Sequence, residues 1–376
     1  MKDKIINFIM IIFALIIFAG VVFFAWIVYR EFFTEDTIES IHTDNNAKIT
    51  YDESKNETKE NQSLSNTISE TFGLLEDSKD AVSYPSENST GNYFYKQLSD
   101  TQKKIYDGIQ SNKDKLKSGT YAIEYGNAFS DTLSKENGED TLGYDYQTAI
   151  EAFIQDNTDI FYLDPSKMFL NIKKSKKAFS TTYDVEIKPE SGKTYLEDGF
   201  NSETDVNNAI REVENVRNEV KNKLTGNTYK DIKMIHDYLI DTVDYNEKDD
   251  NIGGHSIYGA LVEKKCVCEG YAKAFKYLAD MAGIDNVLMQ GTAINSNSEK
   301  RELHAWNAVF LNNNWYLIDT TWDDPIIIGR GIVLNNVHYR YFLKGYTSFY
   351  ANHTLNPQLT EGGKIFSYPT ISATDY

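Results

Sequence analysis

The hydrophobic pattern of the chain begins with one long apolar run. Residues 5–28 read IINFIMIIFALIIFAGVVFFAWIV, with no charged residue and a single Asn. A membrane-spanning helix needs roughly 20 apolar residues, so this run is long enough to cross a bilayer. A cleavable signal peptide has a shorter apolar core, about 7–15 residues, before a small-x-small site. Here the run continues past Ala19 and Gly20, so we expect an uncleaved transmembrane anchor.

The charges on either side of this run indicate its orientation. Lys2 and Lys4 precede it, whereas the residues that follow are mainly acidic, with Arg30 as the contrary charge. Positively charged flanks tend to stay on the cytoplasmic side. We therefore expect a short cytoplasmic end at residues 1–4, a single span at 5–28 as the contact with the membrane, and an extracellular C-terminal region.

Polar residues dominate the next segment, 29–90. It contains runs such as NNAKITYDESKNETKENQSLSN, which offer little apolar surface to bury. Segments of this composition cannot offset the entropy lost on folding. The pattern predicts an acidic, disordered or loosely helical stalk that holds the folded part away from the membrane.

Helical and strand periodicities appear between residues 91 and 225. Asp100 is a suitable N-cap for a helix over 101–119, and Pro165 follows a second helical pattern over 146–163. Alternating runs at 167–174 and 181–189 read as strands, and 201–224 reads as a long amphipathic helix. We expect a smaller mixed α/β extracellular domain here, with a packing or binding role and no chemical site.

From residue 226 to 376 the pattern changes from helices to strands. A helical stripe covers 229–243, and another begins after Cys268 and ends at Gly283, a suitable C-cap. Alternating runs follow in VLMQGTA, LHAWNAVFL and NWYLIDTTW. Helices followed by strands indicate an α+β fold, in which helices pack on an antiparallel sheet.

Composition and charge narrow the class of protein. The 376 residues include 26 Tyr and 20 Phe, which is enough for a sizeable core. The formal net charge is −18. Because such an acidic surface repels phosphate backbones, we expect no nucleic-acid partner.

Both cysteines of the chain, Cys266 and Cys268, lie two positions apart. Cys268 falls at the start of the predicted helix, where unpaired N–H groups favour a thiolate and can stabilise an oxyanion. A structural zinc site needs four ligands, and the sequence has no second cysteine pair, so we expect no metal. A Cys266–Cys268 disulfide would close a short, strained ring and block the nucleophile. We interpret Cys268 as a catalytic thiol and Cys266 as its neighbour.

A two-residue turn sets the expected register of the last two strands. Asn312 and Asn313 separate the strands, and Asn tolerates the positive φ that such a turn demands. The turn predicts that Leu311 pairs with Asn314.

This register brings a base and an acid together. Trp306 then faces Asp319, and His304 faces Thr321, so His304 and Asp319 become diagonal neighbours on one face. A slip of one residue would separate them. A thiol nucleophile needs a base, and the base needs an orienting acceptor, so the pattern predicts His304 and Asp319 for these roles beside Cys268.

The other histidines carry weaker signals. His236 lies beside an apolar helical stripe and is expected at the edge of the core. His255 and His338 lie near loops, where they could line a cleft, whereas His42 falls in the stalk and His353 near the C-terminal end.

Three tryptophans, Trp306, Trp315 and Trp322, cluster around the predicted hairpin. Most of this cluster is expected in the core, with Trp306 and Trp322 as candidates to contact substrate. Asp323 and Asp324, which precede a proline, are interpreted as turn residues, with substrate or cation binding as the alternative.

Three segments, HDYLIDTVDY, CEGYAKAFKYLADMAGI and LHAWNAVFLNNNWYLIDTTWDDP, together resemble the bacterial transglutaminase-like superfamily. The resemblance covers roughly residues 228–345. It implies a papain-like α+β core and a catalytic triad of Cys268, His304 and Asp319, without a cofactor. One departure is Cys266, where a small or apolar residue is expected.

We therefore expect a membrane-anchored, extracellular thiol enzyme that acts on amide bonds of peptides or proteins at the cell surface or in the cell wall, through an acyl-thioester. Hydrolysis is preferred. A cross-linking transglutaminase would use the same triad, and a non-enzymatic surface module that keeps the fold for binding is the competing class. The sequence leaves the substrate, the acyl acceptor, calcium dependence and oligomeric state open.

Overall fold

The computed structural model describes residues 92–176, 180–246, 253–294, 301–324, 338–355 and 366–376, with Val22, Phe23, Trp26 and the backbone of 37–43. Within this part of the chain, no helix is both long and apolar enough to cross a membrane. The predicted span at 5–28 lies outside the described residues, apart from the three named. The anchor therefore stays a prediction.

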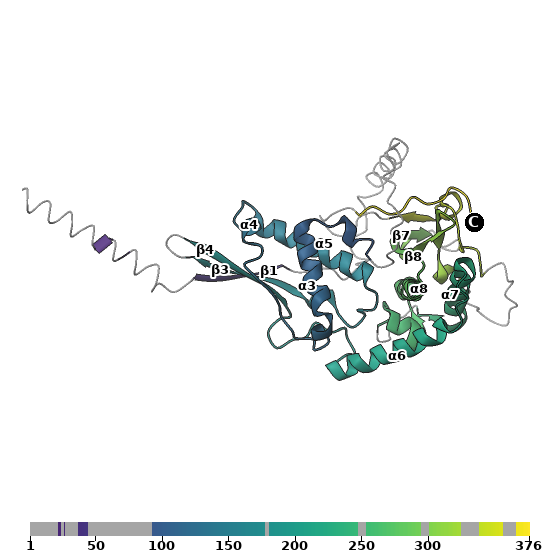
Figure 1. Ribbon diagram of the computed structural model, residues 1–376, viewed down its shortest axis with the longest axis horizontal. Coiled ribbons are helices and arrows are strands. Elements are labelled where there is room, and N and C mark those ends of the chain that lie inside the picture. Colours follow the sequence, from purple (N-terminus) through teal and green to yellow (C-terminus); the bar gives the residue numbers. More distant parts are fainter. Residues whose placement is uncertain are drawn as a thin grey trace, which may run out of the picture.

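The first region combines helices with a four-stranded sheet (Figure 1). The strand order is β1–β3–β4–β2, with neighbours antiparallel. The strands are β1 (Thr37–Thr43), β2 (Ile123–Gly126), β3 (Phe169–Lys176) and β4 (Thr181–Lys188). The helical segments are η2 (Tyr95–Gln97), α3 (Asp100–Leu116), α4 (Ser130–Leu133), α5 (Gly138–Asp156) and η3 (Pro165–Lys167). Residues 37–43 of the predicted stalk thus form an edge strand, and the rest of 29–90 lies outside the described residues.

Two helix ends differ from the expected ones. Ser99, not Asp100, caps α3, because its hydroxyl accepts from the Gln102 N–H while the Gln102 side chain accepts from the Ser99 N–H. The second helix, α5, ends at Asp156, well before Pro165. There the Asn157 side chain donates to the Phe153 carbonyl, which satisfies one of the last carbonyl groups of the helix.

The second region is the α+β part. Its main helices are α6 (Glu203–Lys221), α7 (Thr228–Thr242) and α8 (Cys268–Met281), and its shorter helices are η4 (Gly259–Glu263), α9 (Thr320–Asp323) and α10 (Tyr346–Phe349). Its strands are β5 (Asp244–Tyr245), β6 (Lys265–Cys266), β7 (Asn286–Ile294), β8 (Arg301–Leu311), β9 (Asn314–Ile318) and β10 (His353–Leu355). The main sheet has the order β10–β7–β8–β9, and every pairing in it is antiparallel. The predicted arrangement of helices on an antiparallel sheet is confirmed here.

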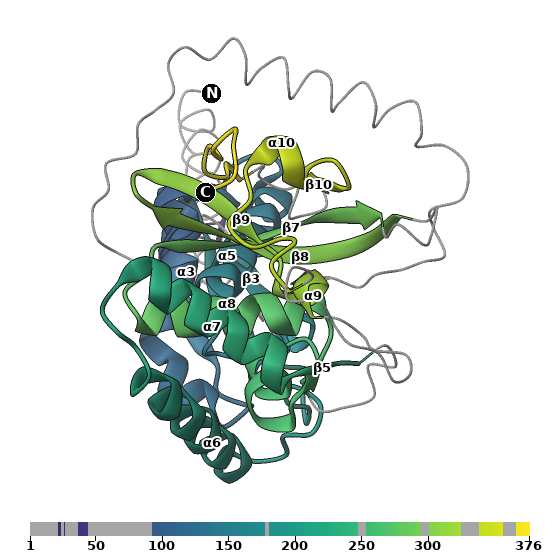
Figure 2. The ribbon, with the colours of Figure 1, turned by 90° about the vertical axis from the view of Figure 1, so that its right-hand side faces the viewer.

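Helix α8 is the central helix of this region. It packs on β7 and β8, with α7 beside it, and Figure 2 shows both helices on one face of the sheet. Gly283, with φ +72°, follows the end of the helix as predicted. Helix α6 contacts α8 and η4, and the buried apolar residues of both regions form one continuous core. The start of α8 is therefore held from several sides.

The hairpin of β8 and β9 has the expected register. Leu311 pairs with Asn314, and Asn307 pairs with Ile318. Asn312 and Asn313 have φ values of 50° and 65°, as a two-residue turn of this type requires. This turn places His304 near the far end of β8 and Asp319 directly after β9.

A glycine inserted between Asn312 and Asn313 should weaken this region. The extra residue breaks the match between turn and strands, so we expect a loss of at least about 1 kcal/mol, or roughly 2–4 °C in melting temperature for a domain of this size. Thermal unfolding of the full-length protein measures this. Asn313→Gly keeps the loop length and the positive φ, and serves as the matched control. Equal melting of the insertion variant and the control would show that the turn does not set the register.

Candidate active site

Cys268 stands at the first position of α8. The residue before it, Val267, has extended backbone and no side-chain acceptor to cap the helix. The first N–H groups of a helix lack intrahelical partners, so they point toward the space beside the thiol. Cys268 is buried, with 6% of its surface exposed. The helix thus offers partial positive charge and hydrogen-bond donors where an anion could form.

His304 and Asp319 meet as predicted, but the predicted pairing of His304 with Thr321 does not form, because β9 ends at Ile318 and Thr321 lies in α9. His304 Nε2 lies 2.7 Å from Asp319 Oδ2, and both side chains are buried. Because Nε2 faces the carboxylate, Nδ1 is the nitrogen left for the thiol, and Cys268 lies close enough to raise the pKa of His304. The structure therefore brings together the three residues that the sequence singled out.

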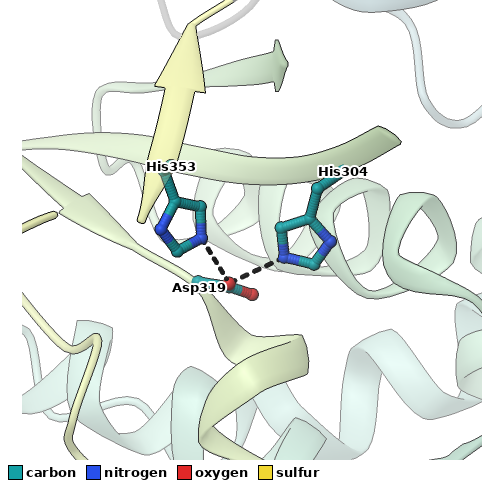
Figure 3. Close-up of side chains that lie close together, drawn as sticks. All are labelled: His304, Asp319 and His353. Atoms are coloured by element: carbon teal, nitrogen blue, oxygen red, sulfur yellow. Dashed lines mark hydrogen bonds and ion pairs between the residues drawn. The ribbon is translucent and has the colours of Figure 1, made fainter. Parts of the chain in front are cut away.

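Asp319 accepts hydrogen bonds from several segments that meet at the site. Among the described residues, four donors reach its two oxygens. Oδ1 accepts from the backbone N–H groups of Thr321 and Trp322, each at 3.1 Å, which makes Asp319 the N-cap of α9. Oδ2 accepts from His304 and, at 3.1 Å, from Nε2 of His353 (Figure 3). Burial acts to raise the pKa of Asp319, but the charge and hydrogen bond of His304, followed by His353, hold this pKa well below its usual range.

The same pairing determines the protonation of His304. Burial alone would lower the pKa of this imidazole. The charge of Asp319 and its hydrogen bond, with a smaller contribution from Cys268, outweigh burial and raise the pKa to about 10. His304 is therefore protonated at neutral pH, and this proton is available to a leaving group.

His353 is a member of the site that the sequence did not reveal. It lies 34 positions from Asp319, at the start of the edge strand β10, and is fully buried. The surrounding sequence, FYANHTL, has no periodicity or motif that indicates a contact with the hairpin. Only the pairing of β10 with β7, His353 opposite Ala293, brings this ring to Asp319.

The site also has the donor types of a metal centre. One ligand atom each from His304, Asp319 and His353 lies within 4.8 Å of the others. Both imidazole Nε2 atoms, however, already face the same carboxylate oxygen at hydrogen-bond distance. We therefore describe the group as a hydrogen-bonded network.

Cys266 has a packing role. It is a free thiol, as is Cys268, and it is fully buried in β6. A Cβ atom added to Gly270 would come within 2.5 Å of Cys266 Cβ and 2.8 Å of its Sγ, so this side chain fits against the first turn of α8. Burial, then the nearby Cys268 and Asp324, raises the pKa of Cys266 well above its usual value.

The two tryptophans proposed to contact substrate lie in different surroundings. Trp306 is 1% exposed and belongs to the core. Trp322 is half-buried, and its ring centroid lies 5.0 Å from that of His304 and 4.6 Å from that of His353. Trp322 therefore borders the site directly.

Asp323 and Asp324 are not simple turn residues, because each binds a side chain of another helix. Asp323 Oδ2 lies 3.1 Å from Nε2 of His236 on α7, and both side chains are fully buried. Asp323 Oδ1 accepts from the Tyr341 N–H at 2.8 Å. The Tyr271 hydroxyl of α8 donates to Asp324 at 2.5 Å. These bonds tie α9, and with it Asp319, to α7 and α8.

The family model of the transglutaminase-like superfamily matches residues 214–320, from within α6 to the first residue of α9. This part of the chain is therefore a transglutaminase-like superfamily domain.

Individual relatives are more distant. Kyphoscoliosis peptidase from Mus musculus is 32% identical over 73 residues, which are 18% of this chain and 11% of that protein. The matched segment thus spans about a tenth of the length of this curated relative. Among solved structures, a TGase has a TM-score of 0.28 at 14% identity, covering 47% of this chain and 50% of its own. The periplasmic domain of TgpA from Pseudomonas aeruginosa has a TM-score of 0.24 at 12% identity, covering 39% and 56%.

The two thiols should differ in reactivity. Near neutral pH we expect iodoacetamide to label Cys268 at least about tenfold faster than Cys266, because only Cys268 has the helix terminus and His304 beside it. Tandem mass spectrometry after limited alkylation distinguishes them, although one tryptic peptide contains both. In denaturant the two rates should become equal. Preferential labelling of Cys266 in the folded protein would reassign the nucleophile.

Proposed function

We propose that this protein is a thiol enzyme that cleaves amide bonds of peptides or proteins, with Cys268 as nucleophile, His304 as general base and acid, and Asp319 as the orienting acid. The observation that carries the proposal is the buried His304–Asp319 pair, with Nε2 2.7 Å from Oδ2, beside the Cys268 thiol at the start of α8. A buried carboxylate, an imidazole and a thiol at a helix N-terminus are the parts that nucleophilic acyl transfer requires.

In the proposed reaction, the Cys268 thiol has passed its proton to His304, and the Sγ thiolate attacks the amide carbonyl and forms a C–S bond as the carbonyl π bond opens. The backbone N–H groups at the start of α8 stabilise the negative oxygen of the tetrahedral intermediate. The proton on His304 passes to the leaving amine as the C–N bond breaks, which leaves an acyl-thioester. Water then loses a proton to His304, attacks the thioester and releases the acid and the thiol. Asp319 stays charged throughout and keeps the imidazole in the required tautomer.

Hydrolysis is the preferred outcome. The segment that matches kyphoscoliosis peptidase supports it through that protein's name. If a primary amine replaces water in the second half of the reaction, the same residues perform protein cross-linking. Both activities share the acyl-thioester, so the test must vary the acceptor.

His304→Ala and Asp319→Asn should each lower acyl-thioester formation by about 10³–10⁴-fold, because members of a triad act as a unit and the Asn variant favours the wrong tautomer. Rates are measured on a peptide library with and without an added primary amine. Tyr144→Ala, an exposed residue of α5 outside this network, is the control and should keep wild-type rates. Peptide release without amine incorporation supports hydrolysis, whereas amine incorporation shows transfer.

The same variants test the competing class. A protein that binds surface ligands without catalysis would form no acyl-enzyme on Cys268 in the wild type. A folded His304→Ala or Asp319→Asn protein with full reactivity toward the same peptides would also contradict the triad.

Anchoring in the membrane by residues 5–28, with the rest of the chain outside, is part of the proposal. Its support is the uncharged run and the charges on either side of it. Protease added to intact cells should digest the region after residue 31, and alkaline carbonate should leave the N-terminal fragment in the membrane. Protection of that region would contradict the proposed orientation, and extraction of the N-terminal fragment by carbonate would contradict the proposed anchor.

A further inference from the structure

Asp319 Oδ2 is shared by two imidazoles, and the proposed reaction uses only one of them. His304 Nε2 lies 2.7 Å from this oxygen and His353 Nε2 lies 3.1 Å from it (Figure 3). The two rings reach the same oxygen side by side, one from β8 and one from β10, with ring centroids 5.6 Å apart. A carboxylate oxygen only accepts hydrogen bonds, so each Nε2 carries a proton.

The orientation of the His353 ring is fixed on all sides. It stacks on Phe349 with ring centroids 3.9 Å apart, and Trp322 and Tyr341 contact it at 4.6 Å and 5.3 Å. Its Nδ1 lies 2.9 Å from Oδ1 of Asn352 and 3.3 Å from the backbone carbonyl oxygen of Phe349. The packing leaves the ring no other direction for Nε2 than Asp319.

The surroundings of His353 lower the pKa of its imidazole. Burial and the charge of His304 together outweigh the Asp319 carboxylate and the Phe349 carbonyl, which raise this pKa. Among the described residues in contact with the ring, Asp319, His304 and Tyr341 are the ionisable ones. The Asn352 NH₂ donates to the Tyr341 hydroxyl at 2.7 Å, and its Oδ1 faces Nδ1 of His353.

We infer that His353 is a positioning residue of the proposed triad, which holds Asp319 Oδ2 in line with His304 and draws off part of its negative charge through the Nε2–H. This inference rests on the proposed function, because it concerns how Asp319 acts on His304.

The inference predicts the direction in which the pKa of His304 changes in two variants. Without the His353 donor, the full charge of Oδ2 acts on His304, so the pKa of His304 rises further. Without the Asp319 charge, the pKa of His304 falls. Loss of His353 and loss of Asp319 should therefore move the titration of His304 in opposite directions, which a general loss of packing would not do.

The test compares wild type, His353→Phe, His353→Gln and Asp319→Asn as full-length proteins. The rate of Cys268 alkylation by iodoacetamide is measured against pH by mass spectrometry, and each variant is checked by thermal unfolding. The second, upper inflection of the wild-type profile should mark the loss of the His304 proton. His353→Phe should raise the second inflection by about one pH unit, a tenfold change in proton affinity. His353→Gln retains an N–H donor and should restore most of the wild-type profile.

The outcomes separate the two proposals. If Asp319→Asn leaves the wild-type profile unchanged, the triad itself is wrong. If Asp319→Asn lowers the second inflection but folded His353→Phe leaves it in place, only the role of His353 is overturned. If His353→Phe is too unstable to titrate, the comparison of His353→Gln with His353→Asn tests the role of His353. The shorter Asn side chain cannot place its N–H at Oδ2, so His353→Asn should shift the second inflection as expected for His353→Phe. A chelator that abolishes the difference between wild type and variant would reassign His353 to metal binding and overturn the inference.

Discussion

The structure around the site depends on one buried negative charge. Asp319 is fully buried, and a buried carboxylate without partners would be strongly destabilising. Two backbone N–H groups of α9 and two imidazoles supply the donors that keep it charged. Three separate segments, β8, α9 and β10, therefore have to meet at this carboxylate. Because all of them must be in place at once, the geometry of the site and the stability of this sheet are linked.

Helix α9 connects this charge to the rest of the domain. It has only one turn, so it cannot be stable by itself. Asp319 caps its start, while Asp323 and Asp324 near its end bind His236 of α7 and Tyr271 of α8. The same α8 begins with Cys268. The thiol and the carboxylate are thus attached to a common frame, and their relative positions do not depend on an exposed loop.

The features that could be predicted from the sequence are those that depend on neighbouring residues alone. The Asn312–Asn313 turn has only one compatible register, and that register places His304 beside Asp319. Likewise, the apolar stripe after Cys268 and the glycine at position 283 define both ends of α8. The contribution of His353 could not be predicted, because it depends on an edge strand that reaches the sheet through long-range pairing alone. The strand at 37–43 could not be predicted for the same reason. Its polar residues are typical of a linker, and they form a strand only by pairing with β3. The contact of Asp323 with His236 could not be predicted either, because the two residues are 87 positions apart in the sequence.

The packing of Cys266 against Gly270 has a consequence for oxidation. A thiol of raised pKa, enclosed by the first turn of α8, is a poor nucleophile. If peroxide converts Cys268 to a sulfenic acid, Cys266 is badly placed to resolve it as an internal disulfide. Recovery of the thiol then depends on a small reductant that reaches the site from outside. If the domain lies outside the cell, as proposed, such reductants are scarce, and oxidised Cys268 would persist for longer than a thiol that has a resolving cysteine beside it.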